Sequence, residues 1–249
     1  TGLSTASTDI ITITVTDAVT AQQGADIIGK TAGDVTFTTG VNDAHGSLIT
    51  ADTASTNLTT ILNNGGADAV PVTITGTMAD MSANDVTALN LVTAGTTGTV
   101  TATIDGNIAQ LDDLSTNASQ AATCALAITV ADAVDITGGK AVVDATAGTI
   151  TFTTGISDTL ANCIDTNAIH SDLTAIKNKH GSININLGTI NTITASQITH
   201  LNLVTDVTTG TVTATIDGNI AQLDDLAANT SQTGTCALTI IVADAVTVT

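Results

Sequence analysis

Short runs in which apolar and polar residues alternate recur along the whole chain. Alternation over four to eight residues is typical of a β-strand with one buried face. The runs begin about 28 residues apart, a spacing typical of repeat proteins that stack one structural unit on the next. The strands predicted in this way are residues 11–16, 35–39, 72–77, 99–104, 126–130, 149–153, 182–187, 211–216 and 238–242.

The chain also contains a longer repeat. The stretch TGTVTATIDGNIAQLDDL at residues 97–114 returns without a change at residues 209–226, 112 positions later. Other phrases return in the same order, among them VTFTTG as ITFTTG. We therefore predict one copy over about residues 9–123, a second over about 124–237, and the start of a third at 238–249.

Helix signals lie between the predicted strands. Ser82 is followed three residues later by Asp85, and Thr194 by Gln197, which is the pattern of a capping box at a helix N-terminus. Apolar residues then recur at helical spacing after each box. These helices are predicted to be about two turns long and to need packing on a sheet, because isolated short helices are marginal in water.

Strand, helix, strand at a short period predicts parallel strands joined by right-handed crossovers. The expected fold class is therefore a repeat protein, a single parallel β-solenoid (β or α/β) over residues 1–249. It would have right-handed coils of about 28 residues with short helices on one side. Inward positions would be apolar, such as Val100 and Ile104, and outward positions would be Thr, such as Thr101.

The amino-acid composition excludes some classes of partner. All 23 acidic residues are Asp, only four residues are cationic, and the net charge is −19. This balance argues against nucleic acid and anionic membranes as partners, since both require clustered Lys and Arg. No apolar run reaches the length of a membrane span. The residues also show no pattern of a catalytic constellation, and we expect a non-enzymatic protein.

Aspartates near the repeated DGN turns are the candidates for metal binding. Carboxylates are hard oxygen ligands, and Ca²⁺ is the cation that such a set would hold. The same residue type also caps helices and closes Asx turns, and we favour this second interpretation. No other cofactor is predicted. The weak Ca²⁺ candidates are Asp105, Asp112, Asp113, Asp217, Asp224 and Asp225.

Regular Thr-x-Thr rows are the most distinctive surface feature predicted. They resemble the rows of insect and bacterial ice-binding solenoids, and this resemblance implies ice binding as an alternative function. Thr is also simply a polar residue that suits an exposed parallel sheet. The predicted exposed Thr ladder consists of Thr12, Thr14, Thr36, Thr38, Thr73, Thr75, Thr101, Thr103, Thr129, Thr151, Thr153, Thr213 and Thr215.

The odd number of cysteines makes a disulfide framework improbable. Cys124 and Cys236 are repeat equivalents, and Cys163 stands apart. Cys163 with His170 as base would be the only nucleophile pair to consider, and a small buried side chain is the simpler interpretation for Cys163. The four His residues show no zinc-ligand spacing.

The phrases TITVTDAV, GTVTATI and ISDTLAN resemble those of giant Thr/Ala/Asp-rich repetitive surface and secreted proteins of aquatic bacteria, cyanobacteria among them. This resemblance implies an extracellular or cell-surface location and a structural role in a fibre, sheath, surface layer or adhesin stalk. Neither end of the chain looks like a polar cap, which a soluble repeat array needs. We therefore expect head-to-tail self-assembly, or further repeats of the same chain, promoted by Ca²⁺.

Overall fold

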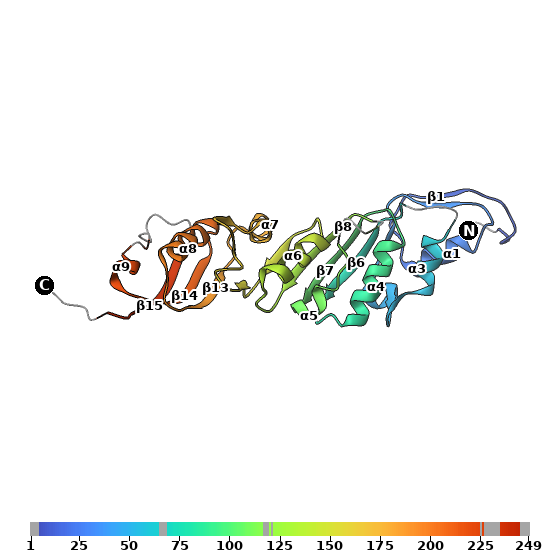
Figure 1. Cartoon of the computed structure of the whole chain (residues 1–249). Coiled ribbons are helices and arrows are strands. Elements are labelled where there is room, and N and C mark those ends of the chain that lie inside the picture. Colours follow the sequence, from blue (N-terminus) through green and yellow to red (C-terminus); the bar gives the residue numbers. More distant parts are fainter. Residues whose placement is uncertain are drawn as a thin grey trace. The chain divides into compact units, whose positions relative to one another are not determined.

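The computed structural model covers the whole chain and describes residues 5–64, 69–116, 120, 122–224, 226 and 235–244. Residue contacts divide it into two compact units, each described by itself (Figure 1). The first unit contains residues 1–129 and 144–149, and the second contains residues 130–143 and 150–249.

The described elements of the first unit begin with a strand and alternate with short helices. Its helices are α1 (Ala21–Ile28), α2 (His45–Leu48), α3 (Thr56–Leu62), α4 (Ala83–Ala94) and α5 (Ile108–Leu111). Its strands are β1 (Ile13–Val15), β2 (Val35–Phe37), β3 (Val41–Ala44), β4 (Ile49–Thr50), β5 (Thr53–Ala54), β6 (Val72–Met78), β7 (Val100–Gly106) and β8 (Cys124–Val130), whose last residue is assigned to the second unit.

The second unit repeats much of this order. Its helices are α6 (Ile136–Ala145), whose last two residues are assigned to the first unit, α7 (Ser171–Lys179), α8 (Ala195–Val207) and α9 (Ile220–Leu223). Its strands are β9 (Ile150–Phe152), β10 (Ile156–Ser157), β11 (Ile164–Asp165), β12 (Ala168–Ile169), β13 (Ile185–Ile190), β14 (Thr211–Gly218) and β15 (Thr235–Val242). Each of the nine predicted strands overlaps one of the strands β1, β2, β6 to β9 and β13 to β15, although β13 begins three residues later than predicted.

The main sheets pair parallel strands through crossovers. In the first unit, β1 pairs with β2, and the order β3-β6-β7-β8 forms a larger sheet in which β3, β6 and β7 are parallel. In the second unit, β10, β13, β14 and β15 follow one another in a sheet, all in parallel (Figure 1).

The core is a set of aliphatic layers between these sheets and the helices. Val72, Val100 and Ile104 are fully buried on the inner face, while Thr101 between them is half-buried. The capping boxes predicted from the sequence are present: Ser82 with Asp85 begins α4, and Thr194 with Gln197 begins α8. Both helices are longer than the two turns predicted, at 12 and 13 residues.

The predicted single parallel β-solenoid is wrong. The chain is mixed α/β, with several small separate sheets, two of which are antiparallel hairpins. One hairpin joins β4 to β5 and the other joins β11 to β12, and each turn contains a residue with positive φ, Ala51 at 55° and Thr166 at 58°. The sequence did not reveal these turns because hairpin signals rely on Gly or Asn at such positions, and Ala-Asp and Thr-Asn lack that pattern.

Glycines interrupt the regular ladder in each unit. The register of β6 against β7 shifts between Thr73 and Thr77, at Gly76 with a φ of +81°. The register of β13 against β14 shifts between Asn186 and Thr189, at Gly188 with a φ of +64°. A bulge of this kind bends the strand and increases its twist, so the strands do not stack as uniform coils.

Candidate functional site

The strand β15 differs in its exposure from its equivalent strand in the repeat, β8. β8 and β15 are sequence equivalents, and both contain Cys-Ala-Leu. On β8 the side chains of Ile128 and Val130 are 2% and 0% exposed. At the equivalent positions of β15, Ile240 and Val242 are 48% and 41% exposed. Among the described residues, β15 is the last strand in its sheet order, and its apolar row is exposed beside this edge.

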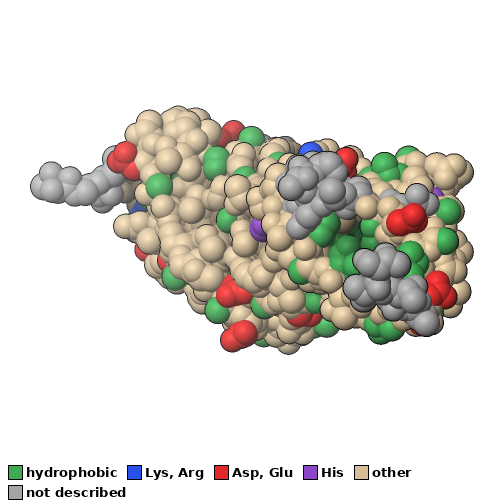
Figure 2. Space-filling model, turned by 90° about the vertical axis from the view of Figure 1, so that its left-hand side faces the viewer, with side chains coloured by type: hydrophobic (Ala, Val, Ile, Leu, Met, Phe, Trp, Pro, Cys, Tyr) green, Lys and Arg blue, Asp and Glu red, His purple; other side chains and the backbone are tan. Residues whose placement is uncertain are grey.

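Exposed apolar side chains on an edge strand mark a place for association with another chain. Ile241, on the other face of β15, is also half exposed at 50%. Figure 2 shows hydrophobic and Asp side chains on one face of the molecule. The net charge of −19 predicts that association between copies of the chain depends on salt.

The segment that follows β8 in the sequence supplies hydrogen-bond partners to its backbone. The hydroxyl of Thr146 accepts from the N–H of Leu126 (2.8 Å) and donates to the carbonyl oxygen of Leu126 (2.8 Å). The N–H of Ala147 donates to the carbonyl oxygen of Cys124 (2.8 Å), and the N–H of Ile128 donates to that of Thr149 (2.9 Å). A following segment of chain therefore satisfies the backbone on one side of β8.

Within the described residues, the same arrangement occurs in four segments, which we call the Thr-x-Gly segments: residues 31–33, 96–98, 146–148 and 208–210. In each, the Thr is buried and its hydroxyl accepts from the N–H of the Gly two residues later. The hydroxyl also donates to a carbonyl oxygen near the start of the preceding strand, such as Ile11, Val70, Leu126 or Ile183. The sequence analysis missed these residues, although the recurrence of Thr-x-Gly was a visible signal.

The predicted Thr ladder residues are all exposed or half-exposed. Thr14 is paired with Thr36, and the hydroxyl of Thr101 donates to that of Thr73 (3.1 Å). The rows do not run on as Thr, however. Asn42 precedes Thr73 in register, and in the second unit Thr213 lies between Asn186 and Ala237.

The six Asp residues proposed for Ca²⁺ do not converge. Asp105 lies on β7 and Asp217 on β14, both half-buried, while Asp112 and Asp224 end α5 and α9 as C-caps. Asp113 is exposed, and Asp225 lies outside the described residues. Over the described part of the chain, no group of three or more His, Cys or Asp side chains is arranged to hold a metal ion.

Other Asp residues act as helix caps across the fold. In the first unit, Asp43 accepts from the N–H of Ala21 at the start of α1 (3.0 Å). In the second, Asp158 accepts from the N–H of Ile136 at the start of α6 (3.1 Å), and Asp244 from that of Ile220 at the start of α9 (3.1 Å). A carboxylate at a helix N-terminus satisfies an otherwise unpaired donor and favours the helix dipole.

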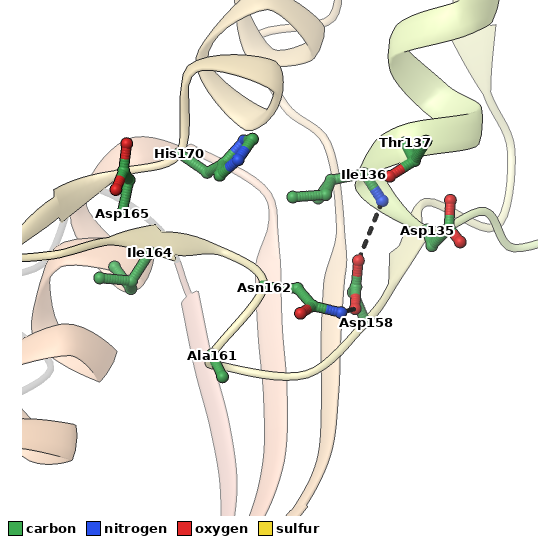
Figure 3. A pocket seen from close by; sticks show the side chains of 9 residues that line it. All are labelled: Asp135, Ile136, Thr137, Asp158, Ala161, Asn162, Ile164, Asp165 and His170. Atoms are coloured by element: carbon green, nitrogen blue, oxygen red, sulfur yellow. Dashed lines mark hydrogen bonds between the residues drawn. The ribbon is translucent and has the colours of Figure 1, made fainter.

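A polar pocket of about 480 Å³ lies beside the Asp158 cap in the second unit (Figure 3). Asp135, Asp165, Asn162 and His170 also line it, and His170 points into the space between α7 and α6. Asp158 is already engaged, since it accepts from Ile136 and from the side chain of Asn162 (2.7 Å). The Nδ1 atom of His170 accepts from the N–H of Asp172 (3.2 Å). These polar groups therefore serve the local structure of two helix starts.

A backbone hydrogen bond joins the two candidates Cys163 and His170: the N–H of His170 donates to the carbonyl oxygen of Cys163 (2.8 Å). Cys163 is fully buried, and burial, together with the charge of Asp158, raises the pKa of its thiol to about 12. The thiol is protonated at neutral pH, so this cysteine has the character of a small core residue rather than a nucleophile.

No family model, curated protein or solved structure matches this chain. Within the described residues, no helix is long and apolar enough to cross a membrane. The function must therefore be argued from the surface and the repeat themselves.

Proposed function

We propose that this protein is a non-enzymatic structural repeat protein that builds an extracellular fibre, sheath, surface layer or adhesin stalk by head-to-tail assembly. The observation that carries the proposal is the exposed apolar row of β15, at positions that are buried on its equivalent β8. A surface contact of this kind joins one patch to a different patch on the next copy, and such heterologous contacts extend rather than close.

Two further observations support the proposal. The repetitive Thr/Ala/Asp phrases resemble those of secreted surface proteins, which favours a location outside the cell. In the polar pocket, Asp158 and His170 accept hydrogen bonds from backbone N–H groups at the starts of α6 and α7, which favours a structural role for these two side chains.

Light scattering and negative-stain electron microscopy of the purified chain test assembly directly. The wild type is expected to form elongated particles whose mass grows with protein concentration and with NaCl or millimolar CaCl₂, because cations screen the charge of −19. The variant Ile240→Asp should remain monomeric under the same conditions, and Thr239→Asp on the other face of β15 serves as the control. Wild type that stays monomeric at high concentration in salt would contradict the proposal.

Equal effects of NaCl and CaCl₂ at matched ionic strength would indicate screening alone. A larger effect of CaCl₂ that a chelator reverses would indicate that Ca²⁺ bridges carboxylates.

Ice binding is the second candidate, and the exposure of the Thr ladder favours it. It ranks below assembly because Asn and Ala interrupt the rows and the bulges at Gly76 and Gly188 break their spacing. Thermal hysteresis and ice-crystal shaping by the wild type, lost in Thr101→Lys and Thr213→Lys, would establish it. Ice crystals that keep their ordinary shape in the presence of the wild type would contradict ice binding.

A further inference from the structure

A pair of titratable side chains joins the start of α2 to the start of α4 in the first unit. The Nε2 atom of His45 lies 3.3 Å from the Oδ1 atom of Asp85. This nitrogen is buried, although the two side chains as a whole are 35% and 26% exposed. The pair therefore lies at the margin of the core, where water screens a charge less than it does on an open surface.

The two carboxylate oxygens of Asp85 have separate roles. Oδ2 accepts from the N–H (2.9 Å) and from the hydroxyl (2.7 Å) of Ser82, which closes the capping box of α4. These hydrogen bonds hold the carboxylate in one orientation, and Oδ1 then faces the imidazole of His45. Although partial burial acts to raise it, the pKa of Asp85 is held below its usual value by Ser82 and by His45.

The second unit has an uncharged pair at the equivalent positions. The residue two positions after the aspartate that caps the first helix of each unit is His45 in the first unit and Leu160 in the second. The capping boxes likewise align Asp85 with Gln197. Leu160 and Gln197 line one cavity of about 210 Å³, so these two residues are also neighbours. Both charged groups are thus replaced together, while the cap of the helix is kept.

Other carboxylates near α2 have different positions and partners. α2 packs against β3, β4 and β6, and the titratable residue on these strands is Asp43 of β3, whose oxygens accept from the N–H groups of Ala21 and Ala44. Asp52 lies in the turn between β4 and β5, and Asp80 lies before α4; both are exposed. Their effect on an imidazole is screened by water, so a test must isolate the contribution of Asp85.

We infer that His45 and Asp85 form a pH-sensitive clamp that holds α2 against the start of α4 in mild acid, and that the first unit differs from the second in this respect. An imidazole changes its charge between about pH 5 and 8, whereas a carboxylate is ionised over this whole range. The attraction is therefore present near pH 5.5 and is lost as the pH rises toward 8. This inference concerns the stability of one unit and does not depend on the proposed assembly.

A double-mutant cycle in the full chain tests the clamp. The four proteins are the wild type, His45→Leu, Asp85→Gln and the double variant, which carries the residue types of the second unit. Asp85→Gln removes the charge and keeps a capping box, because Gln197 forms one in α8. Far-UV circular dichroism confirms that each protein folds.

Hydrogen exchange measures the clamp locally at pH 5.5 and at pH 8. Protection factors are used because they remove the pH dependence of exchange in an unfolded chain. The amides of Ser55, which donates to Leu48 at the end of α2, and of Val86 in α4 report the first unit. The amide of Ile198 in α8 reports the second unit, and its response to pH should be the same in all four proteins.

The expected result is a coupling between the two substitutions that depends on pH. At pH 5.5 the protection factors of Ser55 and Val86 should show a coupling of about two- to fivefold, the size of a partly exposed ion pair. At pH 8 the coupling should be close to onefold. Absence of coupling at pH 5.5, or the same coupling at both pH values, would overturn the inference.

A second cycle separates the charge of His45 from its shape. His45→Gln replaces the imidazole with an uncharged polar side chain, and with Asp85→Gln it should give the same coupling at pH 5.5 and the same loss at pH 8. A coupling that appears with His45→Leu and not with His45→Gln would show that packing, rather than charge, links the two residues, and would also overturn the inference.

Discussion

β8 and β15 share the residues Cys-Ala-Leu and have apolar residues at equivalent positions, yet one is in the core of its unit and the other has an exposed apolar row. β8 is followed by a Thr-x-Gly segment that bonds to its backbone, and β15 is the last strand of its sheet. The comparison shows that the residues of a strand determine which face is apolar, while the neighbouring segment determines whether that face is covered. The predictions below separate these two contributions.

Replacing the central apolar residue of each strand should give the largest difference. Ile128→Asp would bury an unpaired carboxylate and should cost at least about 3 kcal/mol of unfolding free energy. Ile240→Asp, on the exposed row, should change the stability of the monomer by less than about 1 kcal/mol. Urea unfolding followed by circular dichroism measures both. Equal losses would mean that the two strands have the same surroundings.

The next largest loss of stability is expected when a side chain is added to Gly148, because this residue lies close to the backbone of β8. A Cβ at Gly148 would overlap the carbonyl oxygen of Leu126, so Gly148→Ala should cost about 3 kcal/mol. Gly46 in α2 has open space around it, and Gly46→Ala should be neutral or stabilising by up to about 1 kcal/mol. Thermal or urea unfolding of the two variants compares them within the first unit. If Gly148→Ala is as stable as Gly46→Ala, the contact does not exist.

Loss of the buried hydroxyl of Thr146 should reduce the unfolding free energy somewhat less than Gly148→Ala does. Thr146→Val keeps the shape but leaves the N–H groups of Leu126 and Gly148 without their acceptor, at a cost of about 2 kcal/mol. Thr103→Val, at an exposed position of β7, should lie within about 0.5 kcal/mol of the wild type. Hydrogen exchange adds a local measurement, since the amide of Leu126 should lose protection in Thr146→Val only.

The smallest expected difference is in how the two capping boxes respond to low pH. Partial burial tends to raise the pKa of Asp85, but hydrogen bonds from Ser82 and the charge of His45, 3.3 Å away, outweigh it, and the pKa lies below its usual value. A lowered folded-state pKa means that this stabilisation is present above the unfolded pKa of about 3.9 and is lost as pH falls through the folded pKa. Gln197, at the equivalent place in α8, does not titrate.

The stability difference between the wild type and Asp85→Gln should therefore shrink when urea unfolding is repeated at pH 3 instead of pH 6. The other 22 Asp residues are common to both proteins, so their titration largely cancels in the difference. The effect should stay below about 1 kcal/mol, the size of one helix cap. A difference that is unchanged by pH would show that Asp85 is not ionised in the cap.

Several features could be read from the sequence because they depend on near neighbours in the chain. The positions of nine strands, the inward facing of Val100 and the capping boxes at Ser82 and Thr194 all follow from period-2 alternation or from a three-residue spacing. The repeat at residues 97–114 and 209–226 likewise indicated that β7 and β14 would be equivalent strands. Side-chain period and cap chemistry act within one element, and so they leave a pattern in the residues.

Tertiary structure alone decided how these elements combine. The hairpins at β4-β5 and β11-β12 turn at Ala51 and Thr166, residue types that carry no signal for a positive φ. Thr129 lies on an outward face, whereas Thr146, a residue of the same type, is buried. Only the fold brings the hydroxyl of Thr146 to the backbone of Leu126. Ile128 and Ile240 occupy equivalent positions of the repeat, and their exposed fractions are 2% and 48%. Burial depends on the segment that packs against a strand, and no residue of the strand itself encodes whether that segment is present.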